Sequence, residues 1–125
     1  MSKKRILVVE DGITMRMFYR DVLERAGFHV DEAANGVEGL ERALTNGCDL
    51  MLVDVNMPKM DGYQLIGQIR LDPTLRAVPV ITISTEAQEK DALKAYEAGA
   101  NFYIVKPPDP DELVDAVRLL TGIAA

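Results

Sequence analysis

The chain has 125 residues and a formal net charge of -6, with 48% hydrophobic and 27% charged residues. This length fits one domain, and this composition is typical of a globular protein with an apolar core. The negative charge argues against a nucleic-acid partner, because phosphate binding needs clustered Lys and Arg. The apolar stretch at residues 6–9 is too short for a signal peptide or a membrane span. We therefore expect a cytoplasmic protein without a membrane partner.

Short apolar runs alternate along the chain with segments of helical periodicity. The runs that predict strands lie at residues 5–9, 28–33, 50–53, 80–83 and 102–105. Gly27, Gly47 and Gly99 fall where the helices between them should stop, and Asp109 followed by Pro110 is typical of a helix start. A strictly alternating (βα)5 chain implies a doubly wound parallel sheet, so the predicted fold class is α/β.

Polar residues follow four of the apolar runs. Glu10 and Asp11 follow the first run, Asp54 the third, Ser84 the fourth and Lys106 the fifth. Because ligands bind outside the carboxyl ends of parallel strands, we expect these side chains on one rim. Three carboxylates brought together either raise their pKa values or recruit a cation. An all-oxygen site of this kind suits Mg²⁺ or Mn²⁺, whereas a bare phosphate would be repelled by the acids after the first strand.

Each of these residues also has a structural interpretation. Glu10 or Asp11 alone is more often a helix cap than a functional group, and Ser84 has the chemistry of a strand-end cap. Asp54 ends an apolar run, where a carboxylate is costly unless it is paired or bound, and this favours a functional role. Lys106 fits a surface lysine and a buried counter-ion equally well. The predicted convergence on one rim favours function for the group as a whole.

Longer motifs surround the rim residues. They are Val8-Val9-Glu10-Asp11, Asp54-Val55-Asn56-Met57-Pro58, Met60-Asp61-Gly62, Pro79-Val80-Ile81 leading to Ser84, Ala98-Gly99-Ala100, and Tyr103-Ile104-Val105-Lys106-Pro107. In these motifs the chain resembles the receiver domains of bacterial two-component response regulators, and in particular the stand-alone, CheY-like chemotaxis regulators. The resemblance covers residues 1–125 and implies a flavodoxin-like sheet with strand order 2-1-3-4-5 and no output domain.

The resemblance implies a role for each residue of the predicted site. Asp54 matches the phosphoacceptor, which attacks a phosphohistidine on a partner kinase. Asp11 matches a direct Mg²⁺ ligand and Glu10 a ligand through water. Asp54 and the backbone carbonyl of Asn56 complete the protein's share of the metal shell. Lys106 matches the lysine that pairs with the phosphoryl group.

The resemblance also implies a conformational switch. Ser84 matches the hydroxyl residue that hydrogen-bonds to the phosphoryl group. Tyr103 matches the aromatic residue that turns into the space left when the Ser84 loop moves inward. Asn56 and Glu86, two positions beyond Asp54 and Ser84, flank the route of water to the acyl phosphate and are expected to tune dephosphorylation.

Some positions depart from the pattern of receiver domains or need a particular backbone. Receiver domains usually hold the bond between Lys106 and Pro107 in the cis form. Pro108 stands where an aromatic residue is common, which removes a bulky apolar group from the expected partner face. Glu10 in place of Asp keeps the charge, and Ser84 in place of Thr keeps the hydroxyl.

The predicted function is a phosphorylation-activated signalling switch and not an enzyme, with intrinsic Mg²⁺-dependent self-phosphorylation and autodephosphorylation. The expected phosphoryl source is a histidine kinase or a histidine phosphotransfer protein. Residues 11–16 resemble the first helix of chemotaxis regulators, so we expect binding to the flagellar motor switch through the last two helices and the strand between them. A monomer is the simplest expectation. One alternative is a phosphorelay intermediate or phosphate sink. The other is a small aspartate-nucleophile phosphatase, but those enzymes usually carry a second acid where this chain has Asn56.

Overall fold

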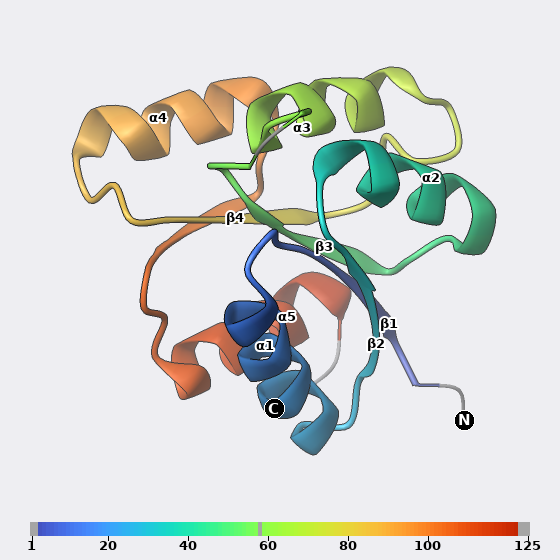
Figure 1. The fold of residues 1–125 in the computed structure, drawn as a ribbon, viewed down its shortest axis with the longest axis vertical. Coiled ribbons are helices and arrows are strands. Elements are labelled where there is room, and N and C mark those ends of the chain that lie inside the picture. The colour runs from blue at the N-terminus through green and yellow to red at the C-terminus, as the bar shows by residue number, and fades with distance from the viewer. Residues whose placement is uncertain (1–2, 58, 123–125) are drawn as a thin grey trace.

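The computed structural model describes residues 3–57 and 59–122, in which strands and helices alternate strictly (Figure 1). The strands are β1 (Arg5–Val9), β2 (His29–Ala33), β3 (Leu50–Asp54), β4 (Val80–Ser84) and β5 (Phe102–Val105). The helices are α1 (Ile13–Arg25), α2 (Gly36–Asn46), α3 (Gly62–Leu71), α4 (Glu89–Ala98) and α5 (Pro110–Thr121). None of these described helices is long and apolar enough to cross a membrane. Pro58 of the 54–58 motif lies outside the described residues, as do residues 1–2 and 123–125 of the predicted domain.

The strands pair in parallel, in the order β2-β1-β3-β4-β5, which confirms the predicted doubly wound α/β fold. The chain changes direction across the sheet between β1 and β3, so the switch point of the topology lies at their carboxyl ends. β3 and β4 each extend one residue beyond the predicted run. Asp54 pairs in register with Ile83, and Ser84 with Val105. The ladder therefore holds the backbone of both candidate site residues in place.

Helices cover both faces of the sheet, with α1 and α5 on one face and α2, α3 and α4 on the other (Figure 1). Along β1, Ile6 and Val8 pack into the apolar cluster under α1 and α5, whereas Leu7 and Val9 pack into the cluster under the other three helices. All four side chains are at most 2% exposed. This double coverage explains the continuous apolar runs and leaves the ends of the strands as the place where polar side chains can gather.

Local signals fix the helix ends that border this rim. Asp109 caps α5, because its Oδ1 accepts a hydrogen bond of 3.0 Å from the N–H of Asp111. Gly62 begins α3 directly behind β3, and a Cβ at this position would lie 2.7 Å from the carbonyl oxygen of Asp54. Only glycine allows so close an approach. α3 is thereby held against the segment that follows Asp54.

Candidate functional site

The candidate site lies at the carboxyl ends of β1, β3, β4 and β5. Glu10 follows β1, Asp54 ends β3, Ser84 ends β4, and Lys106 follows β5. Backbone hydrogen bonds continue the ladder past the strands: the N–H of Glu10 donates to Ala33, and the N–H of Lys106 donates to Ser84 at 2.7 Å. The convergence predicted from the sequence is therefore confirmed.

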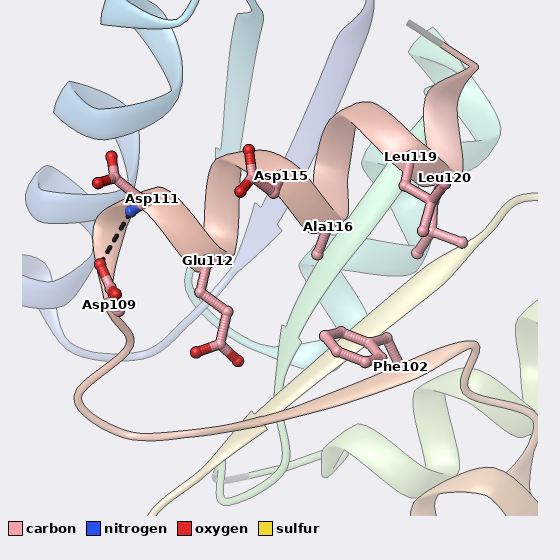
Figure 2. Close-up of a pocket in the computed structure, with 8 residues that line it drawn as sticks. All are labelled: Phe102, Asp109, Asp111, Glu112, Asp115, Ala116, Leu119 and Leu120. Atoms are coloured by element: carbon pink, nitrogen blue, oxygen red, sulfur yellow. Dashed lines mark hydrogen bonds between the residues drawn. The ribbon is translucent and has the colours of Figure 1, made fainter. Parts of the chain in front are cut away.

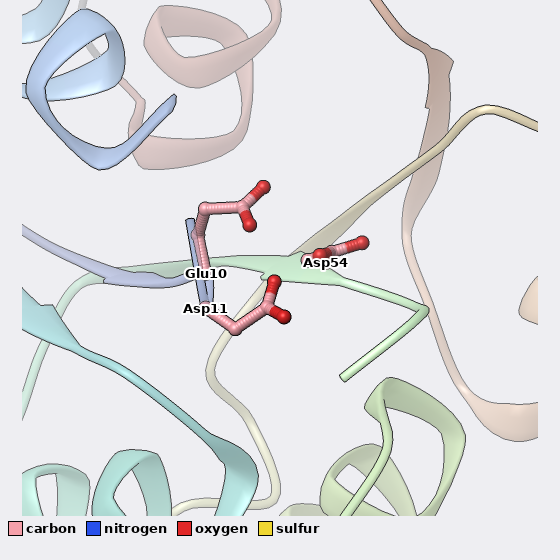
Figure 3. Close-up of side chains that lie close together, drawn as sticks. All are labelled: Glu10, Asp11 and Asp54. Atoms are coloured by element: carbon pink, nitrogen blue, oxygen red, sulfur yellow. The ribbon is translucent and has the colours of Figure 1, made fainter. Parts of the chain in front are cut away.

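Three carboxylates form the centre of the site (Figure 3). Glu10, Asp11 and Asp54 each place one carboxylate oxygen so that all three atoms lie within 4.8 Å of one another. Glu10 is 2% exposed and Asp54 4% exposed, while Asp11 is exposed. Two buried acids thus lie behind a third acid that faces solvent.

The ammonium group of Lys106 bridges the two buried acids. Its Nζ lies 2.8 Å from Oε1 of Glu10 and 3.3 Å from Oδ2 of Asp54. Burial opposes the positive charge, but the hydrogen bond to Glu10 and the charges of both acids outweigh burial and raise the pKa of Lys106. Lys106 is therefore a charged counter-ion and not a free surface lysine.

The ammonium group of Lys106 does not fully offset the effect of burial and of the neighbouring Glu10 carboxylate on Asp54. Burial, followed by the charge of Glu10, raises the pKa of Asp54 from 3.8 to about 7. The N–H of Asn56, which donates to Oδ1 of Asp54 at 3.1 Å, and the charge of Lys106 oppose this rise only in part. The three carboxylates carry more negative charge than the single ammonium neutralises, so a cation would be stabilised at this site. Its oxygen donors are the ligands that Mg²⁺ and Mn²⁺ prefer.

The loop after β4 is tied to both Ser84 and Tyr103. The hydroxyl of Ser84, which is 1% exposed, accepts a hydrogen bond of 3.1 Å from the N–H of Glu86. The hydroxyl of Tyr103 donates to the carbonyl of the same Glu86. Tyr103 already packs against the apolar cluster on the α3 and α4 side of the sheet. The structure thus links the end of β4 to β5 through one loop residue.

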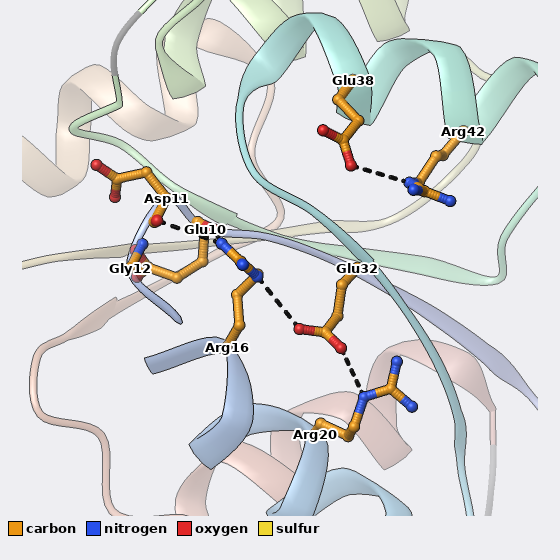
Figure 4. A network of polar contacts seen from close by, with 8 residues as sticks. All are labelled: Glu10, Asp11, Gly12, Arg16, Arg20, Glu32, Glu38 and Arg42. Atoms are coloured by element: carbon orange, nitrogen blue, oxygen red, sulfur yellow. Dashed lines mark hydrogen bonds and ion pairs between the residues drawn. The ribbon is translucent and has the colours of Figure 1, made fainter. Parts of the chain in front are cut away.

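Arg16 is a site residue to which the sequence analysis gave no role (Figure 4). Its Nη1 donates to the carbonyls of Glu10 at 2.8 Å and Asp11 at 3.2 Å, and its Nε donates to Glu32 at 3.2 Å. Arg20 holds the other oxygen of Glu32 at 2.7 Å. These contacts fasten the backbone of the acidic pair to α1 and β2. Helical and strand periodicity could not predict these contacts, because Glu32 lies far from Arg16 in the sequence.

Tyr19 is a second residue without a predicted role. Its side chain is 1% exposed, and its hydroxyl has no hydrogen-bond partner among the described residues. Burial raises the pKa of Tyr19, and the charges of Glu10 and Asp54 raise it further. The phenol of Tyr19 is therefore neutral, and it lies near enough to Glu10 and Asp54 for their charges to affect it. It belongs to the apolar cluster under α1 and α5.

The backbone after Lys106 and the acidic turn after β1 also agree with the predicted pattern. The Lys106–Pro107 peptide bond is cis, as the resemblance implies. Pro108, which replaces the common aromatic residue, is buried. Oε2 of Glu10 accepts a hydrogen bond of 2.9 Å from the N–H of Gly12, so Glu10 has a structural role at the start of α1 besides its place in the cluster.

Comparison with known proteins agrees with this geometry. The family model described as "Response regulator receiver domain" matches residues 6–118. Chemotaxis protein CheY1 of Helicobacter pylori (strain ATCC 700392 / 26695) is 37% identical over 120 residues, which cover 94% of this chain and 97% of CheY1. Transcriptional regulatory protein ResD of Bacillus subtilis (strain 168) is 38% identical over 119 residues, which cover 95% of this chain. The chain spans about half of ResD, since the match covers 48% of that protein.

Solved structures give the same result. Chemotaxis protein CheY4 of Vibrio cholerae superposes with a TM-score of 0.90 at 28% identity, covering 95% of this chain and 99% of CheY4. A CheY-like receiver domain protein of Methanospirillum hungatei JF-1 superposes with a TM-score of 0.87 at 30% identity, covering 97% of this chain and 95% of that one. The fold and the acidic site are those of a phosphoryl-accepting signalling domain. The chain belongs to the response regulator receiver domain family, whose members bind Mg²⁺ through acidic residues and interact with histidine kinases and phosphotransfer proteins.

Proposed function

We propose that this chain is a signalling switch that accepts a phosphoryl group on Asp54 from a histidine kinase or a histidine phosphotransfer protein. The observation that carries the proposal is the environment of Asp54. Its buried carboxylate ends β3 with Lys106 at 3.3 Å on one oxygen and the N–H of Asn56 at 3.1 Å on the other. Phosphoryl transfer needs positioning and charge stabilisation more than covalent help, and this environment supplies both.

The acidic cluster is the proposed Mg²⁺ site. Glu10, Asp11 and Asp54 would hold the ion together with the backbone carbonyl of Asn56, with Mn²⁺ as a substitute. Bound there, the ion would offset negative charge on the transferring phosphoryl oxygens. The excess of carboxylate over ammonium charge at the site supports this proposal.

Lys106 and Ser84 would then bind the phosphoryl group. The hydroxyl of Ser84 accepts a hydrogen bond from Glu86, so its own hydrogen is free to donate to a phosphoryl oxygen. Charge-assisted hydrogen bonds of this kind contribute about 1.5 to 3 kcal/mol each, which shifts an equilibrium between states that differ by a few kcal/mol. A shift of Ser84 would move Glu86 and, through it, Tyr103. Asn56 and Glu86 are the proposed residues that tune hydrolysis of the acyl phosphate.

The proposed pathway is chemotaxis, with a flagellar motor switch protein as the partner of the face formed by α4, β5 and α5. Two features support it: the segment at residues 11–16, and the match that covers 97% of Helicobacter pylori CheY1. The chain is as similar to ResD, a transcriptional regulatory protein, as it is to CheY1, so sequence identity does not decide between the two pathways. A binding test is therefore needed. A motor-switch peptide should bind the phosphorylated chain more tightly than the unphosphorylated chain. Binding that is indifferent to phosphorylation would favour a phosphorelay intermediate or phosphate sink.

The phosphoryl-acceptor role has a direct test. Intact-mass spectrometry after incubation with a small acyl-phosphate donor and Mg²⁺ should detect one phosphoryl adduct, which a chelator prevents. The chain acts as a signalling protein and not an enzyme, because each transfer modifies the chain itself. Steady multiple turnover of a phosphate ester would instead support a phosphatase.

A further inference from the structure

Tyr19 of α1 lies in an apolar cluster, and its hydroxyl plays no part in the packing of that cluster. The other buried residues of the cluster under α1 and α5 are aliphatic or phenylalanine. The cluster reaches the surface between β5 and α5, where Phe102 lies near Ala116 and Leu120 (Figure 2). Tyr19 is 1% exposed and therefore lies inside the cluster, away from this edge. Packing explains the ring of Tyr19 but not its hydroxyl.

Phenylalanine would fill the same space without a polar atom. A buried hydroxyl without a hydrogen-bond partner lowers stability. Within residues 3–57 and 59–122, the hydroxyl of Tyr19 is the one buried side-chain nitrogen or oxygen atom that lacks such a partner. An unsatisfied buried group of this kind calls for an explanation, and a role in function is one of the few available.

The position of Tyr19 on α1 directs its hydroxyl toward the acidic site. Long side chains on a helix lean toward the helix N-terminus, and α1 begins at Ile13, shortly after Glu10. The ring makes an edge-to-face contact with Phe18, with 5.7 Å between the ring centroids. Burial raises the pKa of Tyr19, and the charges of Glu10 and then Asp54 raise it further. The phenol is therefore protonated, able to donate, and near both acids.

Phosphorylation would deprive Glu10 of a donor. In the structure, Oε1 of Glu10 accepts from Nζ of Lys106 at 2.8 Å, and Oε2 accepts from the N–H of Gly12 at 2.9 Å. The proposed function moves the ammonium of Lys106 to the phosphoryl group on Asp54, which leaves Oε1 without this donor. Glu10 is 2% exposed, and a buried carboxylate without a donor is costly. A second donor near Glu10 would therefore favour the phosphorylated state.

We propose that Tyr19 is a positioning residue that donates a hydrogen bond to the Glu10 carboxylate when Lys106 turns to the phosphoryl group. A carboxylate accepts several contacts, so Glu10 can face a cation and Tyr19 together. The hydroxyl, unpaired among the described residues of the unphosphorylated chain, would gain a partner in the phosphorylated chain. This difference shifts the equilibrium toward the phosphorylated state. The inference rests on the proposed function, because Lys106 must leave Glu10.

Lys106→Met tests the proposal without phosphorylation, because it removes the ammonium from Glu10 directly. Tyrosine labelled with ¹³C at the ring carbon that bears the hydroxyl gives one NMR signal for each of the four tyrosines. Tyr19→Phe identifies the signal of Tyr19 by its loss. At pH 8 with a chelator, we expect this signal to shift in Lys106→Met. Lys3→Met, which changes an exposed lysine before β1, is the matched control and should leave the signal in place.

Urea unfolding gives an independent readout that packing alone would not produce. Tyr19→Phe should raise the unfolding midpoint of the parent protein and lower that of Lys106→Met, since the hydroxyl has a partner only in the second background. Tyr63→Phe removes a hydroxyl from a partly exposed tyrosine of α3 and should have the same small effect in both backgrounds. Equal effects of Tyr19→Phe in the two backgrounds, or a Tyr19 signal that Lys106→Met does not move, would overturn the proposal.

The phosphorylated parent protein provides a second measurement if Lys106→Met does not fold. Its Tyr19 signal should shift when a small acyl-phosphate donor and Mg²⁺ are added, while mass spectrometry measures the adduct separately. An adduct with an unmoved Tyr19 signal overturns the role of Tyr19 alone. A Tyr19 signal that shifts in Lys106→Met, when the parent forms no adduct, supports the contact with Glu10 and overturns the proposed function.

Discussion

Replacing Asp54 with asparagine should stabilise the metal-free protein at alkaline pH. The folded chain holds this carboxyl at a pKa of about 7, against an ordinary value of 3.8. The ionised form is therefore disfavoured in the folded state, where it is buried beside Glu10. An amide of the same shape removes that charge and keeps an oxygen that can accept from the N–H of Asn56.

The magnitude follows from the difference between the two pKa values. About three pKa units correspond to about 4 kcal/mol, since each unit corresponds to 1.36 kcal/mol. The substitution also weakens the contact of 3.3 Å with Lys106, which keeps its partner Glu10. We therefore expect the free energy of unfolding to rise by about 2 to 4 kcal/mol at pH 8.

The pH dependence has a definite sign. Because the folded pKa of Asp54 lies above the unfolded value, the folded state binds more protons between about pH 4 and 7. The parent protein should lose stability relative to Asp54→Asn as pH rises through this window, and the two should converge below about pH 4. Mg²⁺ should narrow the gap at pH 8, because it binds the ionised carboxylate.

Urea unfolding at pH 4 and pH 8, with a chelator or with Mg²⁺, measures these differences. Asp115→Asn is the matched control, since this exposed carboxyl should change the free energy of unfolding by less than about 0.5 kcal/mol. A chelated Asp54→Asn protein that is less stable than the parent at pH 8 would refute the reasoning.

Three further substitutions test neighbouring parts of the account. Tyr19→Phe removes a buried hydroxyl that has no partner in the described chain, so the free energy of unfolding should rise by about 1 kcal/mol; a decrease would indicate a partner. Gly62→Ala places a Cβ 2.7 Å from the carbonyl oxygen of Asp54 and should lower stability by about 1 to 3 kcal/mol in urea unfolding. Gly67→Ala, whose new Cβ would meet no described atom within 4 Å apart from its chain neighbours and the backbone of its own helix, is its control and should be neutral or slightly stabilising. Lys106→Met removes the ammonium that competes for the carboxylates, so calorimetry should detect tighter Mg²⁺ binding; weaker binding would contradict the proposed charge balance.

The rim could be predicted from the sequence because it depends on topology. Once the alternation predicts a parallel sheet, Glu10, Asp54, Ser84 and Lys106 must share one edge whatever the details of packing. The extra residue on β3 and β4 was missed because an apolar run ends at a polar residue, while the hydrogen-bonded ladder continues through it.

The contacts that depend on side-chain geometry could not be predicted in this way. Arg16 donates to the carbonyls of Glu10 and Asp11 and also to Glu32 on β2, so its contacts join segments that lie apart in the sequence. Tyr19 satisfies the helical period of α1 as an apolar residue would, and periodicity gives no information about its hydroxyl.

The central claim is that Asp54, and not another carboxylate of the cluster, receives the phosphoryl group. Reduction of the phosphorylated chain with borohydride converts an acyl-phosphate carboxyl to an alcohol, and peptide mass spectrometry then locates it. The account predicts one reduced residue, at position 54, in a reaction that requires Mg²⁺ and is absent from Asp54→Asn. Reduction at Glu10 or Asp11, or an adduct that persists in Asp54→Asn, would contradict it.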